Sequence, residues 1–472
     1  MPEVREPPPG PSPEPLRAPP PNPSPPRFVT GSTMRHVAVM TGTGSVGLVA
    51  VFAVDLLSLL YVSWLGDPAL TAGVGLATIV LFFAVSINVG LMIAVGALVS
   101  RSLGAGERDR ARRLASSACA HMVVAGLAVT LVLLPLLPWL LHLLGATPET
   151  AAVAKRFLWI TLPSNFLMAL GMGFSGVLRA VGDARRSMYV TLAGGIVTAA
   201  LDPLLIFGLH LGTDGAAIAT VVSRMVFVVV GFRGAVGVHR LVARPRLDAA
   251  LRDARALYAI AAPAVLTNIA TPIAGGFVTG VVARFGETAI AASATIDRLV
   301  PVAFGGLFAL SGAIGPILGQ NWGAGRFDRM RRSLRDGIVF TALYVGAVWA
   351  LLLVLRHPLV ALFKATGPGA DLLLFFCLVA GPTWFFIGLL FLANASFNNL
   401  GFPLLSTLFN WGRATIGTMP HAVVGANVAG PEGAIGAIGV GAVDFGTAAI
   451  AAAFRTVGRL EERGPPRLRR EA

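Results

Sequence analysis

Two acidic residues, Asp55 and Asp202, lie inside long apolar runs of the sequence, and Thr198 and Thr220 lie in apolar runs of the same half. Apolar surroundings and a second nearby carboxyl group both favour the neutral form of a carboxylic acid. A bound proton neutralises such a site, and so does a hard cation such as Na⁺, which prefers oxygen ligands. The four residues therefore predict a site that takes up and releases H⁺ or Na⁺.

The estimated depths of these residues agree with one shared site. At about 1.5 Å per residue, Asp55 lies about 15 Å from the outer end of its run, Asp202 about 12 Å and Thr220 about 9 Å. Pro203 follows Asp202 and cannot donate a hydrogen bond to the Ala199 carbonyl, so that acceptor is free at the same depth.

An arginine, Arg224, follows Thr220 by four residues and so lies on the same helix face. One hypothesis makes Arg224 an internal counter-ion for Asp202. The alternative is that its long side chain extends toward the membrane surface. In the second half of the chain, Asp297 is a candidate second acidic site; its neighbour Arg298 points about 100° away in a helix, so the two do not pair directly.

Known catalytic patterns are missing from the sequence. Both lysines, Lys155 and Lys364, lack the Gly-Lys-Ser/Thr context of a P-loop, and the seven histidines include no HExxH motif. We therefore expect neither an ATP-driven pump nor an enzyme, and we expect no bound cofactor or metal centre apart from Na⁺ at Asp55 and Asp202.

The elements that must position these residues are membrane-spanning helices. The chain is 55% hydrophobic and 13% charged, which excludes a soluble enzyme, a disordered protein and a single-span receptor. A span takes about 20 apolar residues, and continuous apolar runs favour helices over barrel strands. The predicted fold is an all-α membrane protein with helices near 36–64, 68–99, 114–141, 152–178, 187–209, 214–238, 255–283, 288–318, 336–355, 370–397, 403–426 and 433–454.

The distribution of basic residues predicts the orientation. If both termini are cytoplasmic, 29 of the 37 Lys and Arg residues fall on the cytoplasmic side, five outside and three within spans. This asymmetry follows the positive-inside rule. It also explains the net charge of +14 without a nucleic-acid partner. We expect a multi-pass protein of the plasma or inner membrane that acts as a monomer.

The sequence contains an internal repeat. Residues 104–113 (GAGERDRARR) and 323–332 (GAGRFDRMRR) match at seven of ten positions with an offset of 219. Six spans per unit make the repeats parallel, with a cavity expected between them. We expect a disordered Pro-rich tail over 1–33, an N-lobe over 34–245, a C-lobe over 246–457 and a basic tail over 458–472.

Several segments resemble the multidrug and toxic compound extrusion (MATE) family. They include VDLLSLLYVSWLGDPALTAGVGLA (54–77), LRAVGDARRS (178–187), LDPLLIFGLHLGTDGAAIAT (201–220) and GQNWGAGRFDRMRR (319–332). The resemblance implies a cation-coupled exporter of amphipathic organic compounds whose coupling acids are Asp55 and Asp202. Thr198 stands where the family often has Asn, which favours H⁺ over Na⁺. The resemblance also implies that Arg298 and Arg413 brace the C-lobe.

The two halves are not chemically equivalent. The offset of 219 places Ala274 opposite Asp55 and His421 opposite Asp202, so the C-lobe lacks the acidic pair. The functional hypothesis is an antiporter that exports small, cationic organic substrates across the lipid bilayer. The alternative is a lipid-linked oligosaccharide flippase of the same broad superfamily, which the three intraspan arginines favour because such a substrate needs a cationic cavity.

Overall fold

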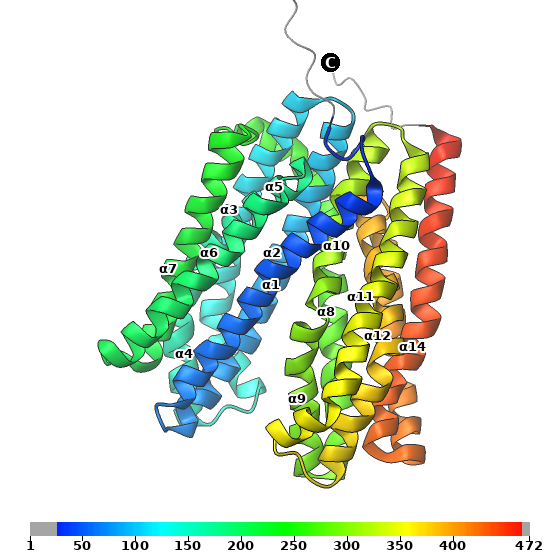
Figure 1. Cartoon of the computed structure of the whole chain (residues 1–472). Coiled ribbons are helices and arrows are strands. Elements are labelled where there is room, and N and C mark those ends of the chain that lie inside the picture. The colour runs from blue at the N-terminus through cyan, green and yellow to red at the C-terminus, as the bar shows by residue number, and fades with distance from the viewer. Residues whose placement is uncertain (1–25, 465–472) are drawn as a thin grey trace, which may run out of the picture.

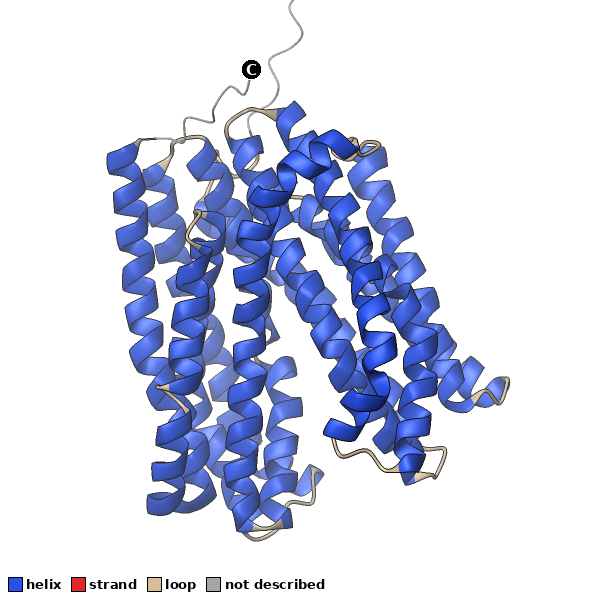
Figure 2. Cartoon of the chain, turned by 180° about the vertical axis from the view of Figure 1, so that it is seen from behind, coloured by secondary structure: helices blue, strands red, loops and turns tan. Residues whose placement is uncertain are grey.

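The computed structural model describes residues 26–464, which form helices joined by short loops (Figures 1 and 2). The first half contains α1 (Thr33–Ser63), α2 (Pro68–Gly104), α3 (Arg108–Leu143), α4 (Pro148–Thr161), α5 (Asn165–Val181), α6 (Ala184–Pro203) and α7 (Gly212–Phe232). The second half contains α8 (Leu247–Val282), α9 (Glu287–Ala303), α10 (Gly305–Gly323), α11 (Phe327–Leu362), α12 (Pro368–Asn399), α13 (Pro403–Thr415) and α14 (Met419–Arg463).

These helices make twelve crossings, as the sequence predicts. Ten segments are long and apolar enough to span a membrane, and the bent pair α9 and α10 makes an eleventh. The segment Pro403–Arg463 counts once in that tally, but it reverses direction at Ala429 and Gly430, where Gly430 has φ 62°. Gly425 then packs directly against Gly433, with an added Cβ lying 2.3 Å from the Gly433 carbonyl oxygen. Two antiparallel crossings result.

The helices form two bundles, the N-lobe (α1–α7) and the C-lobe (α8–α14). The bundles meet at the end where α1 begins and α14 ends, here called the terminal face, and they diverge toward the opposite end (Figures 1 and 2). Helix α1 runs obliquely between them (Figure 1). Near the terminal face, Val37 and Met40 of α1 belong to a C-lobe core cluster, whereas further along Val54 packs against Gly195 of α6. Helix α1 therefore links the two lobes.

The described structure extends beyond the predicted lobe boundaries at both ends. Residues 26–33 are part of the described structure, and Phe28 is only 1% exposed. At the other end, α14 continues to Arg463, and Leu460 is buried in the C-lobe. The predicted tails, 1–33 and 458–472, therefore include residues that belong to the helical fold. Phe28 anchors the first of these segments and Leu460 anchors the second. The rest of the expected tails, 1–25 and 465–472, lies outside the described residues.

Candidate cation site

A buried carboxyl group, Asp202, is the centre of the candidate site. It lies at the end of α6 and is 1% exposed. The Ser58 hydroxyl of α1 donates a hydrogen bond to Oδ2, whereas Oδ1 is buried with no hydrogen-bond partner. A buried charged oxygen without a partner is unfavourable. A proton or a cation bound at Oδ1 would remove this cost, so the geometry leaves one unfilled position at the carboxylate.

The second predicted acid, Asp55, lies on α1 one turn before Ser58, and so on the same helix face. Its side chain is exposed. The sequence analysis missed Ser58, although its signal was present: a lone hydroxyl in the apolar stretch LLSLL, three residues after an acid. Only the structure shows that Ser58 is the contact between α1 and Asp202.

The two predicted threonines make no hydrogen bond to Asp202 among the described residues. The Thr198 hydroxyl donates to the Gly194 carbonyl at 3.1 Å, and the Thr220 hydroxyl donates to the Ala216 carbonyl at 3.0 Å. Each hydroxyl thus donates its proton to a carbonyl of its own helix and keeps its oxygen lone pairs. No hydrogen bond among the described residues joins either threonine to an acid of the site.

The helix changes geometry at the site. Helix α6 ends at Pro203, and residues Leu204–Gly208 form a π-helical turn. Proline removes one backbone donor, and a π turn is a local irregularity that is frequent at functional sites. Asp202 therefore lies where the backbone of α6 stops being regular.

Arg224 does not pair with Asp202, and it does not extend to the membrane surface. It is 6% exposed, and its Nη1 donates to the Thr161 carbonyl at 2.5 Å and to the Ser164 hydroxyl at 2.8 Å. These acceptors lie where Pro163 interrupts the path from α4 to α5 through the 3₁₀ turn Leu162–Ser164. In this structure Arg224 therefore binds acceptors at the break between α4 and α5, and it adopts neither of the two predicted arrangements.

The C-lobe candidates are not joined to one another in this structure. The side chains of Asp297, Arg298 and His421 are all exposed, and no hydrogen bond or ion pair among the described residues involves them. Arg298 therefore does not brace the lobe as expected. Arg413 is 5% exposed and its Nη2 donates to the Thr271 hydroxyl at 3.1 Å, which matches the bracing role.

The lobes meet at the terminal face through residues that the repeat relates to each other. Arg101 Nη2 donates to the Asn399 carbonyl at 3.0 Å, and Gln320 Nε2 donates to the Ala180 carbonyl at 2.6 Å. Arg101 and Gln320 are 219 residues apart, as are Ala180 and Asn399. The same internal repeat that the sequence shows thus forms two equivalent hydrogen bonds between the lobes.

A small cavity of about 50 Å³ lies between the lobes beside this contact. Its walls come from α2, α5, α10 and α12, and Arg179 is its only ionisable lining residue. Arg179 Nε donates to the Ser187 hydroxyl at 3.1 Å, and no ion pair among the described residues involves its guanidinium. Asn398 and Asn399 also line the cavity, and the side-chain oxygen of each is buried without a partner.

A multi-pass helical protein with two related six-crossing lobes and a buried acid inside one lobe is a membrane transporter. The chain belongs to the MATE family: the MatE family model matches residues 45–204 and 263–423, more than half of its length. It is not an enzyme family. The two matched segments fall in the two lobes, as the repeat predicts.

Individual relatives agree with this assignment. The chain is 26% identical to an FAD transporter of Shewanella oneidensis over 398 residues, covering 82% of this chain and 87% of the relative. It is 27% identical to the multidrug export protein MepA of Staphylococcus aureus over 316 residues, covering 65% and 68%.

Solved structures share the fold. A mutant of the Vibrio cholerae MATE transporter VcmN matches with a TM-score of 0.85 at 25% identity, covering 91% of this chain and 98% of that one. An outward-facing multidrug resistance MATE transporter of the MOP superfamily matches with a TM-score of 0.86, covering 93% and 99%; at 19% identity it shows the fold alone.

Proposed function

We propose that the protein is a proton-coupled antiporter that exports amphipathic, cationic organic compounds by alternating access. The observation that carries this proposal is the buried Asp202 carboxylate, with one oxygen bound by Ser58 and the other without a partner. The presence of a multidrug export protein among the relatives supports the substrate class.

The geometry favours a proton over Na⁺. A hard cation needs several oxygen ligands around it. At Asp202 only Oδ1 is unsatisfied, Asp55 is exposed, and the hydroxyls of Thr198 and Thr220 are bonded to their own helices. A single proton on Oδ1 neutralises the carboxylate without any further ligand.

Helix α1 supplies a route from proton uptake to movement of the lobes. Neutral Asp202 accepts a weaker hydrogen bond from Ser58 than the carboxylate does, because charge-assisted bonds are the stronger ones. That contact holds α1 to α6 inside the N-lobe, while Val37 and Met40 hold α1 to the C-lobe. Protonation therefore loosens α1 from one lobe and leaves it attached to the other.

The distribution of basic residues supports an orientation with the terminal face in the cytoplasm and the diverging ends of the lobes outside. A proton then enters from outside and drives export. One proton that moves inward releases about 2.3 kcal/mol per 100 mV of membrane potential and about 1.4 kcal/mol per pH unit. Together these energies support a substrate concentration gradient of a few hundred-fold.

The test is efflux of a fluorescent organic cation from proteoliposomes under an imposed pH gradient or an imposed Na⁺ gradient. We expect the pH gradient to drive efflux in the wild type and not in Asp202→Asn. Asp444→Asn, an exposed acid of α14, is the matched control and keeps its efflux. Efflux that survives Asp202→Asn would refute Asp202 as the coupling acid, and efflux driven by Na⁺ alone would refute the proton.

A second candidate function is transport of anionic, phosphate-bearing compounds, of which a lipid-linked oligosaccharide flippase is one form. The specific observation in its favour is the cavity between the lobes, where Arg179 is the only ionisable lining residue and lacks a carboxylate partner. A guanidinium binds phosphate oxygens in a bidentate manner. The FAD transporter among the relatives fits the same class.

Efflux of the two kinds of substrate, measured in parallel, distinguishes the two substrate classes. A flavin nucleotide and a fluorescent organic cation are loaded in parallel, for the wild type, Arg179→Gln and the exposed control Arg185→Gln. Loss of nucleotide efflux in Arg179→Gln alone supports the anionic class. Cation efflux that is unchanged in all three proteins, without nucleotide efflux, excludes it.

A further inference from the structure

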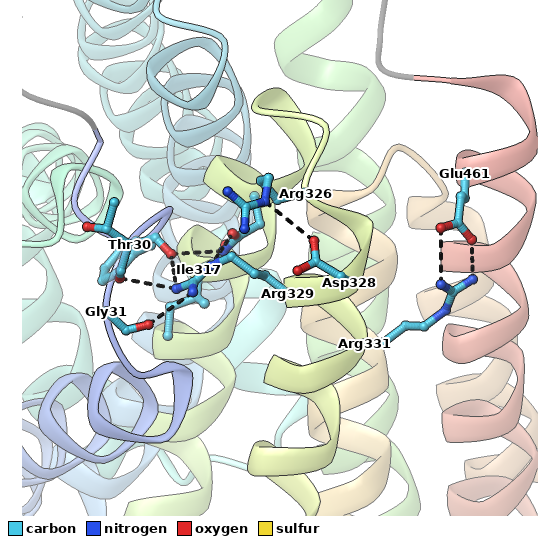
Figure 3. Close-up of polar contacts among 10 residues, drawn as sticks. Thr30, Gly31, Ile317, Arg326, Asp328, Arg329, Arg331 and Glu461 are labelled. Carbon is cyan, nitrogen blue, oxygen red and sulfur yellow. Dashed lines mark hydrogen bonds and ion pairs between the residues drawn. The ribbon is translucent and has the colours of Figure 1, made fainter.

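A short segment before α1 is bound through its main chain by side chains of the C-lobe, and Arg329 makes three of these hydrogen bonds. Arg329 Nη2 donates to the carbonyls of Phe28 and Thr30 at 2.9 and 3.1 Å, and Nη1 donates to the carbonyl of Gly31 at 3.0 Å (Figure 3). Arg329 Nε is held by the Asn321 side-chain oxygen at 3.1 Å. The guanidinium thus binds three main-chain carbonyls within four residues, rather than a particular side chain.

The same segment also contacts the N-lobe. Phe28 is 1% exposed, and its ring lies against Gly182 of the N-lobe, while its backbone N–H donates to the Gln320 side chain of the C-lobe at 2.9 Å. The neighbouring Arg27 donates through Nη1 to the carbonyl of Gly182 at 2.7 Å, in the turn between α5 and α6. Gln320 itself donates to Ala180, so one cluster of hydrogen bonds joins residues 27–31, the C-lobe and the N-lobe.

The segment has a counterpart at the start of the second repeat. The linker before α8 packs on the N-lobe: Leu241 is 0% exposed within the N-lobe core, and Arg108 Nη2 donates to the His239 carbonyl at 2.7 Å. The segment before α1 packs on the C-lobe in the same way, with Phe28 in the C-lobe core cluster. Each lobe therefore binds the chain that precedes the first helix of the other lobe.

We propose that residues 27–31 are a latch that keeps the lobes together at the terminal face, and that Arg329 and Gln320 form its binding site on the C-lobe. The linker before α8 is covalently continuous with both lobes. The latch is held only by hydrogen bonds and one buried ring, so it is the part that can release. Its release is required before the terminal face can open.

The test measures lobe separation in the full-length protein by double electron–electron resonance. Spin labels at Arg185→Cys of α6 and Arg459→Cys of α14 lie at exposed positions of the two lobes, with Cys119 and Cys377 replaced by alanine. The variants are Arg329→Gln and Phe28→Ala. The matched control is Arg326→Gln, because Arg326 pairs with Asp328 in the same turn, and within residues 26–464 its side chain makes no hydrogen bond or ion pair with the latch (Figure 3).

Each hydrogen bond from a charged donor is worth about a tenfold shift in an equilibrium. We expect both latch variants to raise the ratio of open to closed terminal face by at least about tenfold, with Arg326→Gln unchanged. Phe28→Ala removes the ring and leaves the main-chain acceptors, so it tests the latch independently of Arg329. Distance distributions equal to the wild type in both variants would overturn the proposal. No substrate is needed, so this outcome is independent of the proposed export function.

Discussion

The interlobe contact at the terminal face has too little space for a single methyl group. An added Cβ at Gly104 of α2 would lie 2.1 Å from the Gln320 carbonyl oxygen of α10, and one at Gly323 would lie 2.1 Å from the Arg101 carbonyl oxygen. Both neighbours are backbone atoms and cannot rotate away. We therefore predict that Gly104→Ala forces α2 and α10 apart, and that Gly323→Ala has the same effect because the repeat relates the two positions.

The magnitude follows from the cost of overpacking. Inserting a methyl group into a well-packed contact costs about 1–3 kcal/mol, which changes an equilibrium by roughly 5- to 150-fold. The strain acts only across the lobe contact, so opening of the terminal face relieves it while each lobe keeps its fold. Gly96→Ala is the control, since it lies on the same helix α2 with no atom within 4 Å of an added Cβ.

The assay is the distance distribution between spin labels at Arg185→Cys and Arg459→Cys, with thermal unfolding as a check on the fold. We expect a longer distance for Gly104→Ala and Gly323→Ala, and an unchanged one for Gly96→Ala. If Gly104→Ala gave the same distribution as Gly96→Ala, the lobes would not be packed at backbone distance, and the reasoning would be refuted.

Three further predictions concern single side chains. Ser58→Ala removes the donor to Asp202 and should lower proton-driven efflux, whereas Ser63→Ala, an exposed hydroxyl at the end of α1, should not; equal efflux in both would remove Ser58 from the site. Arg224→Met removes two hydrogen bonds from a buried guanidinium, at about 1.5–3 kcal/mol each, and should lower the thermal unfolding midpoint without a change in the pH dependence of efflux. Burial raises the pKa of Asp183, but hydrogen bonds from its histidine and arginine partners outweigh it and hold that pKa below its usual value of 3.8. Its contribution to stability is therefore complete above pH 3.8 and is lost as the pH falls further, so thermal unfolding of Asp183→Asn should lack this acid-dependent step.

The sequence predicted the crossings well because each depends on a local property. About twenty apolar residues in a row form a span whatever surrounds them, and the repeat at an offset of 219 shows directly that the lobes are related. The break at Ala429 and Gly430 was also predicted, since a Gly-Pro pair interrupts the apolar run there. The sequence did not predict that residues 26–33 belong to the fold. Their neighbours are rich in proline, and a single phenylalanine, Phe28, anchors the segment.

Side-chain partners were predicted less well, and Arg224 shows the reason. Sequence spacing placed it one turn from Thr220, which is correct within α7, but it could not give the rotation of α7 against its neighbours. A helix turned by about 100° presents a different residue to each neighbour, because successive residues differ by that angle. In the structure the guanidinium therefore reaches the break between α4 and α5 rather than Asp202.

The sequence by itself determined that this protein is a two-repeat membrane transporter with acids inside its first half, because apolar length, repeat and charge are properties of the chain. The tertiary structure alone decided that Ser58 binds Asp202, that Arg101 and Gln320 join the lobes, and that Arg329 holds the segment before α1. These contacts connect residues that are far apart in the chain. Their distances are fixed only when the helices pack at particular depths and rotations, which local patterns do not encode.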